Sequence, residues 1–306
     1  MRPIPKRLYK YRPFKTDTVI ELERNVVYYA DPKDFNDPLD CSPVVHVDIN
    51  VPELERLCFK MLVQVRGPKA DQQAAKVAAG RRIDKMRYDS TEPDWDGGPV
   101  DVESVLRRYL ARDIQECLER LMRRKGVFSL AQKWNCPLMW SHYAEQHKGI
   151  CIEYDTSQLE FGTPCAIDYS GIRDIKASDL YDWQVKRLTT ARDRVHNSYF
   201  YRKARQWGYE KEWRHVRDSN GVDASPYLIS AINFGLRCDT SVETMIAKLF
   251  RGAKREPALY RICEDTKTFK LKRYRPNLDE LLYESPSISQ YWREKALLAD
   301  FQNLSD

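Results

Sequence analysis

The residues best suited to acid–base chemistry lie in the segment 209–217, which reads YEKEWRHVR. If this segment is a strand, Glu210, Glu212 and Arg214 share one face, and the two carboxylates lie about 6.5 Å apart along the chain. One carboxylate can then stabilise a sugar oxocarbenium ion while the other positions or deprotonates the attacking group. An exposed ion-pair ladder on a strand, or a helical pair of Glu210 with Arg214, explains the same spacing.

A second candidate is the segment 135–149, NCPLMWSHYAEQHKG, which predicts a helix of about three turns with Pro137 in its first turn and Gly149 at its end. In this helix His142 is either a general acid or ligand contact, or a histidine with a structural partner. His142 and His147 are five residues apart, so they do not have the i, i+4 spacing that puts two imidazoles in register for a metal ion.

Two further segments combine residue types that bind small molecules. The turn 34–40, DFNDPLD, could receive ribose hydroxyls or an amide of a cofactor, or it could be a plain Asx turn. The segment 8–14, LYKYRPF, offers aromatic rings beside cations that suit a phosphate, but an edge strand has the same pattern. No P-loop, GxGxxG, GxSxG or zinc-protease motif occurs, so the commonest ATPase, dinucleotide-binding and serine-hydrolase interpretations are excluded.

The elements that must position these residues alternate between β and α character. Residues 8–48 look like strand and turn, with a strand at 26–30. Residues 52–125 have helical periodicity instead, with a first-turn proline at Pro52. Helices are expected near 52–66, 69–87 and 101–125, with a loop at 89–99. The later elements are expected as strands near 127–130, 150–154, 165–169, 212–217, 228–233 and 268–272, a long helix over 185–206, and a helical tail from 277.

Composition narrows the class of protein. The chain has 306 residues, of which 42% are hydrophobic and 31% charged, as expected for a folded globular protein in a cytoplasmic setting. The longest apolar run has five residues, so no membrane span is expected. The eight cysteines are scattered without a C-x-x-C pair, which argues against a zinc ribbon or a disulfide framework. A net charge of +6 permits an anionic partner.

Six of these segments together resemble an uncharacterised bacterial domain family. The motifs follow one another in the chain as LYKY (8–11), FNDPLD (35–40), GVFSL (126–130), MWSHYA (139–144), KGICI (148–152) and EKEWR (210–214). The resemblance covers roughly residues 8–272. Its specificity rests on the recurrence of several rare aromatic and histidine combinations in the same order.

The layout is also similar to that of the ADP-ribosyltransferases, in which a first-strand Arg or His, a second-strand Ser or Tyr and a late-strand Glu of an E-x-E pair hold and split NAD. This resemblance implies an α+β fold with a mixed or antiparallel split-sheet core. We expect one domain over residues 1–275, carrying the helical insertion 52–125, followed by a helical tail at 276–306.

The same resemblance implies a role for each candidate residue. Glu212 would be the catalytic glutamate, Glu210 would orient the acceptor nucleophile, and His142 would complete the catalytic set. This chain has no Ser-Thr-Ser after its second strand, and Asn36, Asp37, His142 and Tyr143 are proposed as substitutes. The residues expected to bind the cofactor are Lys10, Tyr11, Arg12, Tyr29, Asn36, Asp37 and Tyr143.

The implied function is the cleavage of NAD, used as a substrate, and the transfer of ADP-ribose to a macromolecule. The basic balance of charge slightly favours RNA or DNA over protein as the acceptor. An NAD-consuming domain of this size is similar to toxins and phage-defence effectors, for which an antitoxin or regulatory partner is expected. No metal and no membrane are part of this hypothesis.

Two hypotheses of other classes stay open. A nucleic-acid-binding or interaction module without catalysis would use Tyr11, Arg12, Trp213 and Arg217 as a contact surface, and its retention on nucleic acid would be sensitive to salt. A nuclease or phosphodiesterase would bind Mg²⁺ through carboxylates and would be inhibited by EDTA. Its expected ligands are Asp37, Asp40, Glu210 and Glu212.

Overall fold

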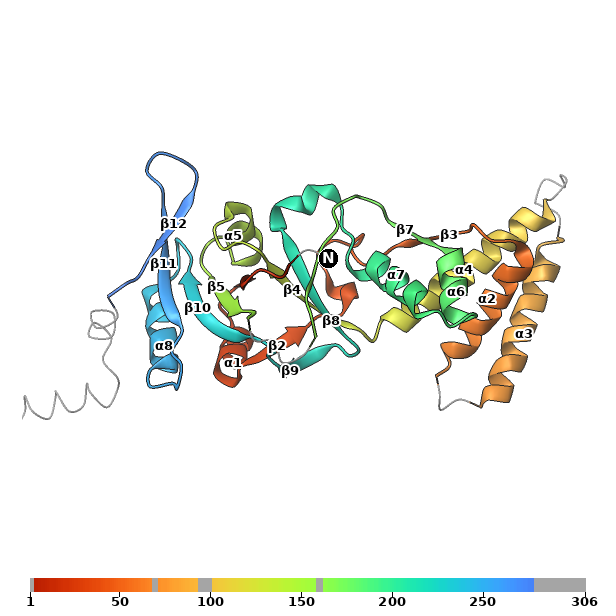
Figure 1. The fold of residues 1–306 in the computed structure, drawn as a ribbon, viewed down its shortest axis with the longest axis horizontal. Helices are drawn as coiled ribbons and strands as arrows, with labels where there is room; N and C mark the ends of the chain where they lie inside the picture. The colour runs from red at the N-terminus through yellow and green to blue at the C-terminus, as the bar shows by residue number, and fades with distance from the viewer. Residues whose placement is uncertain (1–2, 68–70, 93–100, 158–161, 278–306) are drawn as a thin grey trace, which may run out of the picture.

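The computed structural model describes residues 3–67, 71–92, 101–157 and 162–277, and it has an α+β fold, as predicted. The largest feature of the described residues is a mixed, mainly antiparallel sheet of eight strands (Figure 1). In spatial order its strands are β12 (Leu271–Tyr274), β11 (Ala258–Glu264), β10 (Leu228–Phe234), β5 (Ile150–Asp155), β1 (Arg7–Arg12), β4 (Gly126–Ala131), β8 (Glu212–Arg217) and β6 (Cys165–Ala166).

Strand β1 lies inside the sheet, so the edge-strand interpretation of this segment is wrong. Both of its faces are buried, because Leu8 packs in one hydrophobic cluster while Tyr9 and Tyr11 pack in another on the opposite face. It pairs with β5 along all six of its residues, but with β4 only at Tyr9 and Ala131. The sheet therefore opens between β1 and β4.

Two short sheets and ten helical segments surround this sheet in the described residues. The short sheets pair β2 (Val26–Tyr29) with β9 (Gly221–Ala224) and β3 (Val44–His46) with β7 (Asp174–Lys176). The helices are α1 (Thr16–Arg24), α2 (Val51–Gln64), α3 (Gln72–Asp89), α4 (Val102–Met122), α5 (Pro137–Tyr143), α6 (Ala177–Gln184), α7 (Thr189–Phe200) and α8 (Thr240–Phe250), with 3₁₀ turns η1 (Pro32–Asp34) and η2 (Arg205–Glu210). No helix in the described ranges is both long enough and apolar enough to cross a membrane.

Three helices, α2, α3 and α4, lie between β3 and β4, in the range where the sequence predicts helices. Helix α2 begins behind Asn50, whose side chain accepts a hydrogen bond from the N–H of Glu53, and α4 begins behind Asp101, which accepts one from Ser104. Figure 1 places α2, α3 and α4 at one end of the molecule, away from β11 and β12. Their apolar faces form a separate core that α6 and α7 complete.

The long helix expected over residues 185–206 is wrong. The α-helix in this range is α7, which begins only at Thr189, because Arg187 between α6 and α7 has a left-handed backbone with φ of 66°. The chain after Phe200 leaves helical geometry and re-forms as the 3₁₀ turn η2. Helix α1 was also missed, since residues 8–48 were interpreted as strand and turn throughout.

The helix over 135–149 is shorter than predicted and ends at Tyr143, because residues 145–147 all have positive φ. Gly149 does not end the helix; a Cβ there would lie 2.2 Å from the carbonyl oxygen of Arg12, so this position requires close backbone contact. The strand expected at 165–169 has only two residues in β6, and β9, β11 and α8 were not predicted. The predicted helical tail from 277 and most of the predicted loop 89–99 lie outside the described residues.

Candidate active site

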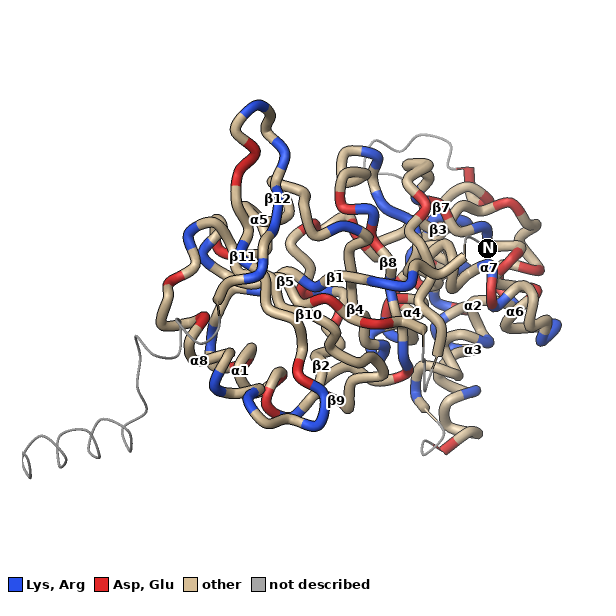
Figure 2. The backbone as a smooth tube through the Cα atoms, turned by 60° about the vertical axis from the view of Figure 1, so that its left-hand side comes forward, with Lys and Arg blue, Asp and Glu red and all other residues tan. Residues whose placement is uncertain are grey.

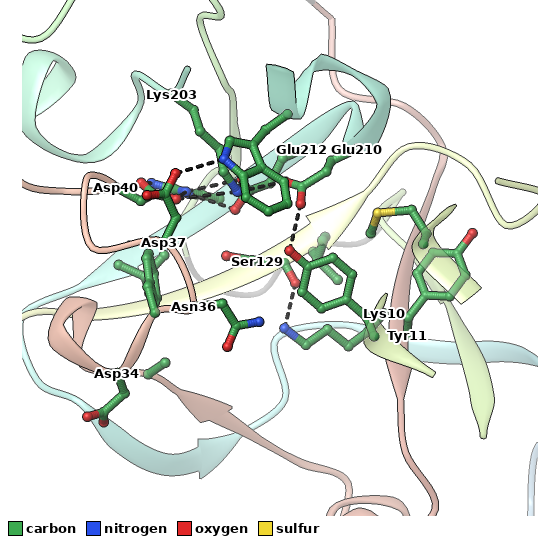
Figure 3. Close-up of a pocket in the computed structure, with 18 of the residues that line it drawn as sticks. Lys10, Tyr11, Asp34, Asn36, Asp37, Asp40, Ser129, Lys203, Glu210 and Glu212 are labelled. Atoms are coloured by element: carbon green, nitrogen blue, oxygen red, sulfur yellow. Dashed lines mark hydrogen bonds and ion pairs between the residues drawn. The ribbon is translucent and has the colours of Figure 1, made fainter. Parts of the chain in front are cut away.

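The opening between β1 and β4 forms a pocket of about 290 Å³, which is close to the lower end of the range for small-molecule sites (Figure 3). Four successive residues of β1 line one wall, and β4, the turn after β2 and the start of β8 line the others. The charged and hydrogen-bonding side chains on its surface are Tyr9, Lys10, Tyr11, Arg12, Tyr28, Asp34, Asn36, Asp37, Asp40, Ser129, Tyr143, Lys203, Trp207, Glu210, Glu212 and Arg214.

One ammonium group lies among three carboxylates at the inner end of this pocket. Nζ of Lys203 is 2.6 Å from Oε2 of Glu210, 3.2 Å from Oε2 of Glu212 and 3.3 Å from Oδ2 of Asp40. The charges of Glu212, Glu210 and Asp40 outweigh the cost of burial and raise the pKa of Lys203 above its usual range. Lys203 therefore stays protonated and holds the two glutamates of the E-x-E pair around one point.

Arg214 is the second cation of this cluster and is fully buried. Its guanidinium donates to Glu212 at 2.7 and 3.1 Å, to Asp40 at 2.9 and 2.5 Å, and to the carbonyl oxygen of Phe200 at 2.7 Å. Burial alone would raise the pKa of Glu212, but the charges of Arg214 and Lys203 outweigh it and lower the pKa to about 2. Glu212 is therefore an ionised carboxylate throughout the physiological pH range.

Glu210 has a different environment from Glu212, although the two residues share Lys203. Burial raises the pKa of Glu210, and the nearby charge of Glu212 adds to this effect against the opposing charge of Lys203. The hydroxyl of Tyr143 donates a hydrogen bond of 2.7 Å to Oε1 of Glu210. The pocket thus holds two carboxyl groups whose pKa values are displaced in opposite directions, an arrangement that suits separate acid–base roles.

The two glutamates face one point for a reason other than strand alternation. Glu210 ends the 3₁₀ turn η2, Lys211 has a left-handed backbone with φ of 49°, and β8 begins only at Glu212. The N–H of Glu212 donates to the hydroxyl of Tyr169 at 2.9 Å. The exposed ladder and the i, i+4 helical pair are both wrong, because both carboxylates are almost fully buried and the segment is a turn followed by a strand.

The wall formed by β1 is basic. Nζ of Lys10 donates to the carbonyl oxygen of Ser129 on β4 at 2.8 Å and lies 5.0 Å from the ring centroid of Phe128. Burial, assisted by the positive charge of Arg12, lowers the pKa of Lys10 to about 7. Arg12 forms an ion pair with Glu21 of α1. In Figure 3 Lys10 and Asn36 lie on one side of the pocket and the cluster of carboxylates with Lys203 on the other.

The turn after β2 contains an Asx turn and also lines the pocket. Oδ1 of Asp37 accepts the N–H of Leu39, which is an Asx turn, and its Oδ2 accepts the indole N–H of Trp207 at 2.7 Å. Asn36 is exposed and lines the pocket. Three residues further on, Asp40 is buried in the charged cluster.

The structure brings eight of the ten predicted site residues onto this single pocket. Those eight are Lys10, Tyr11, Arg12, Asn36, Asp37, Tyr143, Glu210 and Glu212. Tyr29 does not line it, because alternation along β2 turns Tyr29 into the core, where its hydroxyl lies 3.1 Å from Nδ1 of His215. The neighbouring Tyr28, 40% exposed, lines the pocket in its place.

His142 is the second predicted residue that lies outside the pocket lining. Its side chain is exposed on α5 and contacts the rings of Tyr143 and Tyr209. The first of these neighbours, Tyr143, is the α5 residue that reaches Glu210. Both residues were predicted for the site, but only Tyr143 lines the pocket. The rotation of the helix against the sheet, which decides between them, was not known from sequence.

Two predicted arrangements for the other classes of function do not form. The contact surface built on Tyr11, Arg12, Trp213 and Arg217 is wrong, since Tyr11 and Trp213 are buried. Among the described residues, no group of His, Cys, Asp and Glu has a geometry that could hold a metal ion. The carboxylates proposed as Mg²⁺ ligands are instead bonded to Lys203, Arg214, Tyr143 and Trp207.

Sequence reasoning missed Lys203, Trp207 and the role of Arg214 as a buried partner of Glu212. Lys203 falls at the end of the long helix predicted over 185–206, Trp207 directly follows that range, and no local spacing connects either residue to Asp40. For Arg214 a signal was present, since it lies two residues after Glu212 on the same strand face.

A comparison with known protein families matches a segment of the chain that carries several pocket residues. Residues 139–215 match the model of a family described as "Protein of unknown function (DUF2971)". No curated protein and no solved structure matches the chain. The matched segment includes the pocket residues Met139, Tyr143, Lys203, Trp207, Glu210, Glu212 and Arg214. This segment of the chain is thus similar to an uncharacterised domain family.

Proposed function

We propose that the protein cleaves the bond between nicotinamide and ribose in NAD and transfers ADP-ribose to a macromolecule, with nucleic acid favoured over protein as the acceptor. One observation carries the proposal: the paired carboxylates Glu210 and Glu212 meet the cations Lys10 and Arg12 in a single pocket. That pocket lies where the mixed sheet opens between β1 and β4.

Glu212 is suited to the bond-breaking step. Its low pKa keeps a fixed negative charge inside a largely buried site, where electrostatic stabilisation is stronger than in water. As the bond from C1′ of the ribose to the nicotinamide nitrogen breaks, the electron pair leaves with nicotinamide and positive charge develops on the ribose. Glu212 stabilises that charge and accepts a hydrogen bond from the 2′-hydroxyl.

Glu210 is suited to the transfer step. A carboxylate with a raised pKa is a better base than an ordinary one, and the hydrogen bond from Tyr143 fixes its orientation. As the acceptor oxygen or nitrogen attacks C1′, its proton passes to Glu210. Both glutamates contact the same ammonium of Lys203, so their nearest oxygens lie close enough to act on one ribose.

The remaining walls of the pocket suit the pyrophosphate of NAD and keep water from the reacting ribose. Lys10 and Arg12 provide positive charge for the pyrophosphate. The rings of Tyr28, Phe35 and Trp207 provide apolar surfaces that exclude water from the oxocarbenium ion.

The substitution Glu212→Gln tests the proposal directly. We expect it to slow nicotinamide release from NAD by about 100-fold or more, the usual effect of removing one preorganised electrostatic partner. Glu243→Gln is the matched control, since Glu243 is equally buried and paired with Arg261 at 2.6 Å, but lies on α8 outside the pocket. Both variants are compared with the parent protein by circular dichroism and by their unfolding midpoints.

If Glu212→Gln does not fold, Glu210→Gln provides the second test. This variant is expected to release nicotinamide by reaction with water while losing transfer to the acceptor, because Glu210 acts on the acceptor proton. Turnover at the parent rate in both variants would contradict the proposed roles.

A further inference from the structure

The β11–β12 hairpin stands out from the body of the molecule and is strongly basic. Figures 1 and 2 both show it projecting beyond the sheet, and Figure 2 shows Lys and Arg at its tip and along β12. Residues 264–275, EDTKTFKLKRYR, contain five basic and two acidic residues. The pocket chemistry described above does not use any of them.

The tip of the hairpin is an ordered turn. The carboxylate of Asp265 accepts hydrogen bonds from the N–H groups of Lys267 and Thr268 at 3.0 and 2.9 Å, and it also forms an ion pair with Lys272. The N–H of Asp265 donates to the carbonyl oxygen of Lys270 at 3.0 Å. These bonds fix the conformation of the turn.

Phe269 lies on this turn with its side chain fully exposed, at 102% of the reference area. Lys267 and Lys270 on either side are exposed, and neither has an ion-pair partner among the described residues. Tyr274 adds a second ring, 48% exposed, on β12. An aromatic ring flanked by unpaired cations is the combination that single-stranded nucleic acid uses, because a base stacks on the ring while neighbouring phosphates meet the cations.

Protection of an edge strand does not account for this arrangement. β12 lies at the edge of the sheet, and Lys272 on it suits the usual role of an edge lysine that prevents pairing with other strands. Lys267 and Lys270 are on the turn, outside the edge that would pair, and an exposed Phe269 works against protection from aggregation.

Strand β12 of the hairpin packs against neighbouring elements, and Leu271 reaches the cluster that contains a pocket-lining residue. The guanidinium of Arg273 lies 4.8 Å from the ring centroid of Trp134 and 4.2 Å from that of Tyr260. Leu271 of β12 shares a hydrophobic cluster with Tyr11, which lines the pocket. A strand bound along the hairpin would thus be held on the side of the sheet where α5 and β1 meet.

We propose that the β11–β12 hairpin binds single-stranded nucleic acid, with a base stacked on Phe269 and phosphates on Lys267 and Lys270, and presents the strand to the pocket as acceptor. The binding rests on the hairpin alone, whereas its role as acceptor site rests on the proposed function. Binding and NAD cleavage are therefore measured separately.

The test is fluorescence anisotropy with a labelled single-stranded RNA of mixed sequence and its DNA counterpart, at several salt concentrations. Phe269→Ala is expected to weaken binding by about 5- to 150-fold, the effect of losing one stacked base. The double variant Lys267→Gln with Lys270→Gln is expected to reduce the slope of log affinity against log salt by about 1.4, since each phosphate contact on a single strand contributes about 0.7.

The matched control removes the same charge from the other end of the molecule, by the substitutions Lys76→Gln and Lys85→Gln on α3. It should leave both affinity and slope unchanged. Unchanged binding in the hairpin variants, or no binding by the parent protein, would overturn the proposal. Hairpin-dependent sedimentation with anionic phospholipid vesicles, without RNA or DNA binding, would assign the surface to membranes instead.

Nicotinamide release distinguishes the failure of this proposal from failure of the proposed function. The hairpin variants should release nicotinamide in the absence of nucleic acid at the parent rate, because none of these residues lines the pocket. RNA binding by a parent protein that never consumes NAD would contradict only the proposed function. Loss of nicotinamide release in Phe269→Ala without nucleic acid would contradict the separation of the two sites.

Discussion

At the scale of single residues, the site depends on how Lys203 and Arg214 distribute charge over three buried carboxylates. The two cations leave one net negative charge when Asp40, Glu210 and Glu212 are all ionised. Because the contacts are unequal, the pKa of Glu212 falls while that of Glu210 rises. Without the two cations, burying these three carboxylates would destabilise the fold strongly, since unpaired buried charges are strongly destabilising.

Lys203→Met should therefore destabilise the fold by about 3–5 kcal/mol, the cost of leaving buried charges without their partner. The free energy of unfolding in urea measures this effect. Lys85→Met is the control, because Lys85 is 63% exposed and its pair with Asp89 is worth under about 1 kcal/mol. A loss no larger than that of the control would show that Lys203 does not hold the cluster together.

The lowered pKa of Lys10 predicts the direction in which the affinity for NAD changes with pH. Its pKa is lowered to about 7 by burial and by the charge of Arg12, so its positive charge is present below pH 7 and is lost as the pH rises through 7. Affinity for NAD should fall over about one pH unit on either side of that value. Calorimetric titration at a series of pH values measures this fall, and Lys10→Arg, which stays charged, should flatten it. An affinity that rises with pH would exclude Lys10 as the phosphate contact.

At the scale of elements, the pocket exists because β1 pairs fully with β5 and barely with β4. The end of β1 is held by the chain after α5, where Gly149 approaches the carbonyl oxygen of Arg12. This contact links α5, which carries Tyr143, to the strand that carries Lys10 and Arg12. The separation of the strands is thus fixed from outside the pocket as well as by the bond from Lys10 to Ser129.

Gly149→Ala should destabilise the protein by about 1–3 kcal/mol and weaken NAD binding, because the new Cβ forces the backbone of Arg12 to move. Gly80→Ala in α3 is the control. A Cβ at position 80 meets nothing within 4 Å, and alanine should stabilise this helix by up to about 1 kcal/mol. Thermal unfolding and NAD titration of both variants measure the effects. Equal stability of the two variants would contradict the close contact.

The elements with a strong local pattern were predictable, and those defined by contacts distant in sequence were not. The caps at Asn50 and Asp101 and the β-branched and aromatic residues of β5 determine their elements locally. Helix α1 buries Thr18, Glu21 and Leu22, of which only Leu22 is apolar, so few buried apolar residues mark this helix in the sequence. The break at Arg187 depends on a single left-handed residue, and α8 serves as the crossover that lets β10 and β11 run parallel.

The same distinction holds for the site. Glu210 and Glu212 could be selected because their residue types and spacing are unusual. Their partner Lys203 could not, since its place beside Asp40 follows from the path of the chain after α7. Tyr29 was expected in the pocket but does not line it, and which face of β2 meets the pocket could not be known before the pairing of β2 with β9.

At the scale of the whole molecule, the helical end and the sheet are joined through α6 and α7. Val195, Tyr199 and Phe200 of α7 belong to the same core as α2 and α4. Lys203 lies three residues after Phe200 in the chain. The carbonyl oxygen of Phe200 accepts a hydrogen bond from Arg214. The helical insertion therefore supports the segment that delivers the central cation of the site.

Deletion of residues 52–125 is expected to abolish NAD cleavage, because it uncovers the apolar face of α7 and releases the chain that carries Lys203. Leu110→Ala is the milder test, since Leu110 is fully buried in α4 and its truncation should cost about 2–5 kcal/mol. Circular dichroism and nicotinamide release measure both. Full activity in the deletion protein would show that the insertion is independent of the site.

The central claim is most directly tested by incubating the purified protein with NAD labelled in its adenylate half, together with total RNA, DNA or cellular protein. The account predicts that nicotinamide is released, that the label becomes covalently attached to nucleic acid in preference to protein, and that EDTA leaves both unchanged. If no mixture consumes NAD, the account is contradicted, and the carboxylates around Lys203 are then a buried ion-pair network that holds the strands in place.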